Sequence, residues 1–503
     1  MKKLCFLLAL LLLLSGCAAD PSQREPNQPS TFVTESAQPT QSPESGLVTF
    51  DIFAINDLHG RLTDTDAQPG VDELSAYLKQ ARQAGNTILL ATGDMWQGTA
   101  ESNLTRGALM TEWMNELGFA AMTLGGHEYD WGEDGIRENA QLAQFPFLAI
   151  NIYSRQTDKQ ADYCQSSVVL EVDGAQIGII GAIGNCYGAI AAEHTKDVYF
   201  KTGAALTELV MAESQKLRSQ GADFIIYAIH DGYDETYSGT GAMAVESQAL
   251  SGYYDPVLSQ GYVDLVFEAD THFSYVLQDE YGVYHLQAGG NNQAIAHASV
   301  LIDKGRGTSM VFGAELVSAG KYSLAEDDPA VARLLEKYAE QIAPAARILG
   351  SNSQYRPGRS ICQLVADLYC QTGLETWGAQ YDIVLAGGYL SCRSPGYLNP
   401  GQISYSQVQS LLPYDNAITL CSIRGRDLIG KFLETDNESY YIKMTPYGQS
   451  IRSSIDPDGI YYIVTDSYTA DYAYNNLTVV QTYTPSVFAR DLVADYIAAG
   501  RME

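Results

Sequence analysis

Positive charge is scarce in this 503-residue chain. Lysine and arginine together number 30 against 60 aspartate and glutamate residues, and the formal net charge is -30 at pH 7. This balance disfavours unspecific binding to nucleic-acid polymers or to anionic lipid. An anionic substrate would therefore need a metal ion or an arginine placed within its site.

Long apolar runs are missing beyond the first residues. A charged start, Met1-Lys2-Lys3, precedes one apolar run of signal-peptide length, and no later stretch approaches the roughly 20 apolar residues that span a bilayer. The next residues, Leu14-Ser15-Gly16-Cys17, resemble a bacterial lipobox. We therefore predict a lipoprotein signal peptide at 1–16 and lipidation of Cys17. An ordinary signal peptide cut near Ala18 stays the alternative.

The export signal indicates where the protein works. A lipid on Cys17 would be its only membrane contact, holding it to the outer face of a bacterial membrane, either extracellular or periplasmic. Residues 17–47 are rich in proline, serine, threonine and glutamine, a composition typical of a disordered tether.

No two cysteines have CxxC spacing, which argues against metal ligation by thiols. The exported part keeps six of them, and an even number outside the cytoplasm permits disulfides. We predict a bond between Cys164 and Cys186. The other four, Cys362, Cys370, Cys392 and Cys421, would pair among themselves.

The chain is too long for one ordinary core, so we expect two domains plus appendages. From 48 to 323, apolar runs alternate with amphipathic stretches such as 71–84 and 204–220. This alternation predicts an α/β sandwich with helices covering its sheets. A helical apolar spacing at 324–349 predicts a linker helix. Residues 350–503 then read as a mixed α+β domain.

Acidic and imidazole side chains follow the apolar runs of the first domain. Four of the seven histidines lie just past such runs, accompanied by three aspartates: His59, His127, His230, His272, Asp57, Asp94 and Asp130. The carboxyl ends of parallel strands meet at one rim of a sheet, where ligands bind. Carboxylates and imidazoles gathered there are the ligands of a hydrolytic metal centre.

The order of these motifs resembles the 5′-nucleotidase family of two-domain metallophosphatases. The blocks that match its first domain are Asp57-Leu58-His59, Gly93-Asp94-Met95-Trp96-Gln97-Gly98, Gly125-Gly126-His127-Glu128-Tyr129-Asp130, the lone His230, and Ala269-Asp270-Thr271-His272. The resemblance implies a four-layer α/β metallophosphatase sandwich followed by a mixed α+β nucleotide-binding domain. It covers nearly all of the chain beyond the tether.

The resemblance also implies a pair of divalent ions, drawn from manganese, magnesium, cobalt and zinc. The first would be held by Asp57, His59, Asp94 and His272, with Asp94 bridging to a second ion held by His230 and Asp270. Two departures fall on that second ion, since the family's asparagine is Gly126 and a histidine is Asp270. The second site should therefore be weak or absent, or should favour manganese or magnesium over zinc.

Other positions match the family's catalytic and substrate residues. His127, held by Asp130, matches the dyad that stabilises the transition state. The residues that match the substrate-binding side are Arg359, Gly387, Gly388, Arg393, Tyr414 and Tyr468. The glycine-rich loop lacks the family's asparagine, which is Ala386 here, and the family's closing Gly-Gly-Asp is not evident at 472–475.

These motifs predict metal-dependent hydrolysis of phosphate monoesters, chiefly nucleotides, at the cell surface. The partner would be a small-molecule nucleotide or organic phosphate and not a nucleic-acid polymer. The departures at Gly126 and Asp270 keep one alternative open, a catalytically weak or inactive lipoprotein that binds nucleosides or nucleotides. A purely structural or adhesive surface protein is the third reading.

Overall fold

The computed structural model describes residues 46–63, 70–233, 254–323, 325–393, 395–435, 438–471 and 476–502. The predicted signal peptide, Cys17 and nearly all of the predicted tether lie outside the described residues, as do residues 472–475. Among the helices that are described, none combines the length and the apolar character needed to cross a bilayer.

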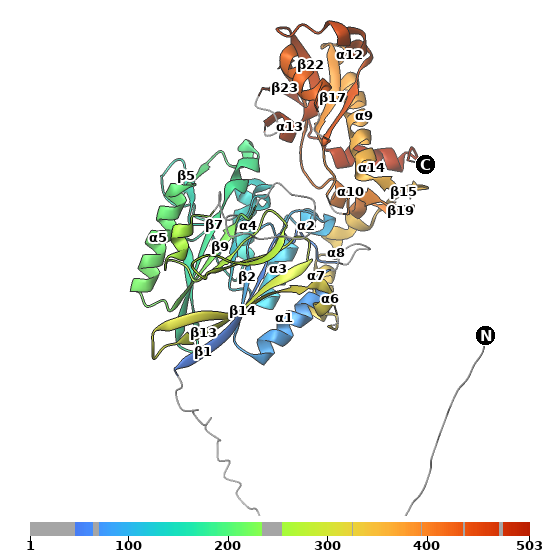
Figure 1. Ribbon diagram of the computed structural model, residues 1–503. Coiled ribbons are helices and arrows are strands. Elements are labelled where there is room, and N and C mark those ends of the chain that lie inside the picture. The colour runs from blue at the N-terminus through green and yellow to red at the C-terminus, as the bar shows by residue number, and fades with distance from the viewer. Residues whose placement is uncertain are drawn as a thin grey trace, which may run out of the picture. The chain divides into compact units, whose positions relative to one another are not determined.

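Two six-stranded sheets form the first part of the fold (Figure 1). The first has the order β14 (Thr308–Ser318), β13 (Ala294–Asp303), β1 (Leu47–Ile55), β2 (Thr87–Ala91), β3 (Ala121–Thr123) and β4 (Phe147–Leu148). The second has the order β11 (Ser274–Gln278), β12 (Tyr284–Ala288), β10 (Leu265–Phe267), β9 (Phe224–His230), β7 (Ala175–Ile183) and β6 (Ser167–Val172). β1 to β4 are parallel, as are β7, β9, β10 and β12.

The two sheets pack face to face through alternate side chains of their strands. In β1, Phe50 and Ile52 enter the core between the sheets, whereas Phe53 and Ile55 face the opposite way. The ring of Phe224 from β9 meets that of Phe50 edge to face, with centroids 6.2 Å apart. Because both faces of these central strands are buried, their sequences are nearly continuous apolar runs.

Helices cover the outer face of each sheet. α1 (Asp72–Ala84), α3 (Ala108–Leu117) and α4 (Gly132–Leu142) pack on the first sheet, and α5 (Ala204–Ser219) packs on the second. The two amphipathic stretches that the sequence predicts as helices are α1 and α5. The order helix, sheet, sheet, helix confirms the predicted α/β fold of four layers (Figure 1).

A further sheet, of five strands, lies in the C-terminal part of the chain. Its order is β21 (Tyr440–Met444), β17 (Ile383–Tyr389), β22 (Ile460–Asp466), β20 (Ile418–Arg424) and β23 (Thr478–Thr482). Only β17 and β22 are parallel in it. The long helix α9 (Gly358–Trp377) and α14 (Ala489–Ala498) share one apolar core with this sheet. Mixed α and β structure is thus confirmed here as well.

The stretch predicted as one linker helix is divided. α7 (Pro329–Lys337) begins after Asp328, whose side chain accepts the amide of Ala330 at 3.0 Å. A short α8 (Ala339–Ile342), a single turn of 3₁₀ helix (Ala343–Ala346) and the strand β15 (Ile348–Asn352) follow. Pro344 lacks the amide hydrogen that a continuous α-helix needs, and its ring restricts the preceding residue. The helical prediction is therefore correct for α7 and wrong for the end of the stretch.

The predicted bond between Cys164 and Cys186 is not formed, and all six cysteines of the described chain are free. Cys164 faces the carbonyl oxygens of Ala149 and Ala161, whereas Cys186 faces that of His230. Among the other four, the sulfur atoms of Cys362 and Cys392 lie 3.7 Å apart. That pair is the one within reach of a bond after a small side-chain movement.

Candidate metal centre

Six acidic and imidazole side chains meet where parallel strands of both sheets end. Each follows, or closes, a strand: Asp57 and His59 after β1, Asp94 after β2, His230 at the end of β9, and Asp270 and His272 after β10. Five of these residues have positive φ, namely Asp57 (49°), His59 (51°), Asp94 (56°), Asp270 (67°) and His272 (58°). Non-glycine residues rarely adopt this conformation, and such strain is concentrated at functional sites.

One group of possible ligands comprises Asp57, His59 and His272. Their ligand atoms all lie within 4.8 Å of one another. Nε2 of His59 is 3.1 Å from Nε2 of His272, which is 3.3 Å from Oδ1 of Asp57. Nδ1 of His59 donates to the carbonyl of Gln97 at 3.1 Å, so its Nε2 is left with a lone pair facing the group.

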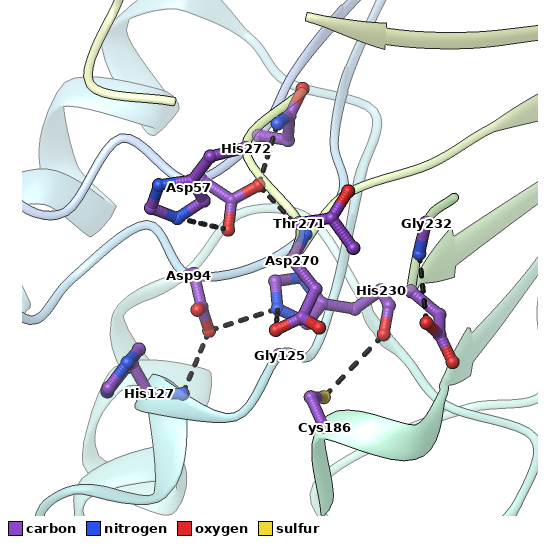
Figure 2. Close-up of polar contacts among 12 residues, drawn as sticks. Asp57, Asp94, Gly125, His127, Cys186, His230, Gly232, Asp270, Thr271 and His272 are labelled. Carbon is purple, nitrogen blue, oxygen red and sulfur yellow. Dashed lines mark hydrogen bonds and ion pairs between the residues drawn. The ribbon is translucent and has the colours of Figure 1, made fainter. Parts of the chain in front are cut away.

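A second group forms around His230. Nδ1 of this fully buried side chain donates to the carbonyl of Thr92 at 2.6 Å. Its Nε2 faces Oδ1 of Asp94 at 3.3 Å and Oδ1 of Asp270 at 3.9 Å. Burial lowers the pKa of His230, but the carboxylate of Asp94 raises it well above the ordinary value, so a bound metal ion would displace a proton from this ring. Figure 2 shows Asp94 joined to both His127 and His230, with Asp270 close to the His230 ring.

Two buried polar atoms indicate that these groups fit cations. Nε2 of His230 and Oδ1 of Asp57 have no hydrogen-bond partner within the described ranges, although both residues are fully buried. Leaving such atoms unpaired is costly unless a ligand satisfies them. Imidazole and carboxylate are the donor types that suit a divalent transition metal or magnesium.

Burial and neighbouring charges shift the pKa values of the possible metal ligands. Burial opposes ionisation of Asp94, but the imidazoles of His230 and His127 pull its pKa well below the ordinary value. For His59, burial and the nearby guanidinium of Arg393 lower the pKa. A charged carboxylate and a neutral imidazole are the protonation states in which these side chains bind a metal.

His127 and Asp130 form the pair expected from the sequence. Nδ1 of His127 lies 3.0 Å from Oδ2 of Asp130, and its backbone amide donates to Oδ1 of Asp94 at 2.8 Å. Burial lowers the pKa of His127, but the charges of Asp130 and Asp94 outweigh it and raise the pKa to about 10. Because Nδ1 is held by Asp130, Nε2 of the His127 ring faces the metal centre.

Glu128 has a role that the sequence motifs did not reveal. Its buried carboxylate accepts the backbone amides of Asp94 at 2.8 Å, Met95 at 2.9 Å and Gly125 at 2.7 Å. It therefore ties the turn after β2 to the turn after β3 and holds Asp94 in place. In the sequence, Glu128 is visible only as an acidic residue in a glycine-rich turn. That position does not show which backbone amides its carboxylate accepts.

Two of the predicted substrate residues reach the centre from the C-terminal part. Nη2 of Arg393 lies 2.7 Å from Nε2 of His127, Nη1 lies 3.2 Å from Nε2 of His59, and Nε contacts the hydroxyl of Tyr414. The ring of Tyr414 stacks on His127 with centroids 5.6 Å apart. A cavity of about 370 Å³ adjoins them and is also lined by Tyr468 and Asp130.

The other three predicted substrate residues do not line this cavity. Arg359 is exposed near the start of α9. Gly387 and Gly388 lie inside β17, where a side chain at 387 would meet the backbone of Tyr441 and one at 388 would meet Thr469 at 2.6 Å. Close packing therefore explains these glycines.

A buried polar network supports the turn that carries Asp270 and His272. Glu268 lies two residues before Asp270 and accepts the hydroxyl of Tyr275 at 2.6 Å. Nδ1 of His285 is 2.8 Å from Glu268 and its Nε2 is 3.5 Å from Asp279. The side chains of His285 and Glu268 are fully buried.

The stability of this network should depend on pH. Burial lowers the pKa of His285, but Glu268 and Asp279 raise it more, from 6.5 to about 9. The folded state thus holds this proton more tightly than the unfolded state. The resulting stabilisation, about 3 kcal/mol, is present in full below a pH of about 6.5 and is lost as the pH rises through about 9.

Urea unfolding of metal-free protein across this pH range measures the effect. The His285→Gln variant should be less stable than the wild type at neutral pH and should lose most of the fall in midpoint toward pH 9. His297→Gln is the control, because His297 pairs with the half-exposed carboxylates of Asp51 and Glu315. An unchanged pH profile in His285→Gln would refute the assignment.

The chain is similar to apyrases and 5′-nucleotidases in sequence and in fold. No family model matches the chain. An apyrase of Tabanus yao is 25% identical over 435 residues, covering 79% of this chain and 75% of its own length. The protein UshA of Yersinia enterocolitica is 25% identical over 463 residues, covering 82% and 80%. A 5′-nucleotidase precursor of Thermus thermophilus superposes with a TM-score of 0.67 at 17% identity, covering 90% of this chain and 97% of its own.

Proposed function

The chain belongs to the 5′-nucleotidase family, with its metallophosphatase fold, and on this basis we propose that it is a metal-dependent phosphoric ester hydrolase that acts on nucleotides. The observation that carries the proposal is the convergence of six acidic and imidazole side chains beside a cavity lined by His127, Arg393 and Tyr414. Nothing in the net charge of -30 attracts an anionic substrate, so the positive charge must be local.

Each residue of the site has a distinct task in this proposal. Asp57, His59 and His272 would hold one divalent ion, and His230 and Asp270 a second, with Asp94 between them. Bound divalent ions supply Lewis acidity and lower the pKa of water to near neutrality. His127, oriented by Asp130, donates a hydrogen bond to the oxygen on which negative charge develops.

The C-terminal residues would bind the substrate. The guanidinium of Arg393 lies beside His59 and His127, where it can pair with a phosphate oxygen. Tyr414 and Tyr468 line the adjoining cavity, and aromatic faces of this kind stack on nucleobases. A nucleoside monophosphate would then have its phosphate at the metal ions and its base in the cavity.

Phosphate release by purified protein tests the function. Protein stripped with a chelator should be inactive toward nucleoside monophosphates, and manganese, cobalt, magnesium or zinc should restore turnover. Calorimetric binding of a nucleotide without any product would favour the nucleotide-binding lipoprotein instead. Absence of turnover with every ion at neutral and alkaline pH would overturn the proposal.

The domain limits and the surface location are proposals of the same kind. Apolar cores that include residues up to Leu334 are separate from those that begin at Leu349, which supports division into 48–323, a linker at 324–349 and 350–503. The lipobox-like residues before Cys17 support export and lipid anchoring. Labelling with a radioactive fatty acid in the wild type and in Cys17→Ser tests the anchor, and equal labelling would contradict it.

A further inference from the structure

A sulfur atom lies beside Gly126. Gly126 has φ −67° and ψ −42°, an ordinary right-handed conformation that any residue can adopt. A Cβ atom at this position would have Sγ of Cys186 as its nearest neighbour, at 3.8 Å. The side chain of Cys186 would therefore be in van der Waals contact with a side chain at position 126.

Cys186 also faces the second group of possible ligands. Its Sγ, a ring nitrogen of His230 and a carboxylate oxygen of Asp270 all lie within 4.8 Å of one another. The unpartnered Nε2 of the fully buried His230 points into the same space. Figure 2 shows Cys186 and Asp270 approaching His230 from different segments of the chain.

The backbone around Cys186 is held firmly against the end of β9. The amide of Gly184 donates to the carbonyl of His230 at 3.0 Å, and that of Asn185 donates to Oδ2 of Asp231 at 2.6 Å. A side chain at Gly184 would collide with Asp231, so glycine permits this close approach. The turn that follows β7 thus presents Sγ of Cys186 to the metal centre.

We propose that Cys186 is a thiolate ligand of the second metal ion, together with Asp94, His230 and Asp270. This inference rests on the proposed function, because it concerns the same metal centre. On binding, the thiol releases its proton to solvent and its sulfur bonds to the ion. The sulfur replaces the ligand that Gly126 cannot supply.

Thiolate ligation changes the metal that the site prefers. Carboxylates without sulfur would favour magnesium or manganese, whereas a thiolate with an imidazole and carboxylates favours zinc or cobalt. With Cys186 as a ligand, the second site should bind thiophilic ions such as zinc or cobalt firmly, and not be weak as the sequence predicts. CxxC spacing, the sequence criterion that argued against thiol ligands, is irrelevant here because the other ligands come from distant strands.

Cobalt substitution of the full-length protein tests the proposal directly. Wild-type protein loaded with cobalt(II) should show a sulfur-to-cobalt charge-transfer band, and bound metal should protect one thiol from alkylation. Cys186→Ala should lose both signals, and its affinity for the second ion should fall about tenfold or more. Cys164→Ala is the matched control, because this buried cysteine faces the carbonyls of Ala149 and Ala161 and belongs to none of the possible metal-ligand groups of the described residues.

A rescue variant separates ligation from packing. Adding Gly126→Asn to Cys186→Ala should restore the affinity for the second ion without restoring the charge-transfer band, since an amide oxygen then replaces the sulfur. A band and an affinity unchanged in Cys186→Ala would overturn the proposal, as would alkylation of Cys186 in wild-type protein regardless of metal. Alkylation needs no variant, so a folding defect cannot obscure the outcome.

The spectroscopic readout also keeps this proposal distinct from the proposed function. Protein that shows the band but hydrolyses no phosphate ester would support Cys186 as a ligand and contradict the enzyme. Protein that hydrolyses nucleotides but shows no band would support the enzyme and contradict the ligand.

Discussion

Replacing Asp94 with asparagine should lower turnover by about a thousandfold or more and reduce the number of bound metal ions. Asp94 takes part in two of the possible ligand groups, one with Asp57 and His230 and one with His59 and His127. A bound metal supplies several kcal/mol of transition-state stabilisation, and each 1.36 kcal/mol is tenfold in rate. The amide would still accept the backbone N–H of His127, so the turn should persist while the negative charge is lost.

Metal analysis by mass spectrometry and steady-state kinetics measure both effects. Asp264→Asn is the control, because Asp264 is a partly buried carboxylate that accepts a backbone amide and pairs with Arg218, but it precedes β10 at the end of that strand opposite to the metal centre. That variant should keep its metal and its turnover per folded molecule. If Asp94→Asn retained its full metal content and activity within tenfold of the wild type, Asp94 would not bridge two ions.

The strand ends of this fold could be predicted from the apolar runs in the sequence. The apolar runs before Asp57, Asp94 and His230 are β1, β2 and β9, and parallel strands bring their following residues to one rim. Both faces of these strands are buried, which is why the runs are continuous and easily recognised. The same runs and the amphipathic α1 and α5 predict an α/β sandwich with helices covering its sheets, whereas the four layers were implied by the resemblance to a known family.

Contacts between segments that are distant in the sequence could not be predicted from such local patterns. Cys186 meets His230 across 44 residues, and Arg393 meets His127 across 266. Neither pairing has a spacing that a sequence pattern can reveal, so Cys186 was assigned to a disulfide with Cys164 and Glu128 was given no role. Within 324–349, apolar positions from Val331 to Ile342 recur at helical spacing, but Pro344 interrupts the hydrogen bonding that would continue the helix.

His127 lies close enough to the metal centre to be either a metal ligand or a hydrogen-bond donor to the substrate. His127 lies with His59 and Asp94 within ligand distance, yet its Nδ1 is engaged by Asp130 and its Nε2 faces Arg393 and the cavity. A hydrogen-bond donor in that position would act mainly on charge that develops during the reaction. Metal content therefore distinguishes a transition-state role from a ligand role.

Replacing His127 with alanine should lower kcat and kcat/KM together by about a hundredfold or more, the usual scale for a positioned donor or proton-transfer group. Metal content should stay that of the wild type. Asp130→Asn should cause a smaller loss, because the ring remains but its orientation is less well held. His297→Gln should leave both constants unchanged, because His297 does not line the cavity and pairs with Asp51. A loss of bound metal in His127→Ala would make His127 a ligand, and a change in KM alone would limit it to substrate binding.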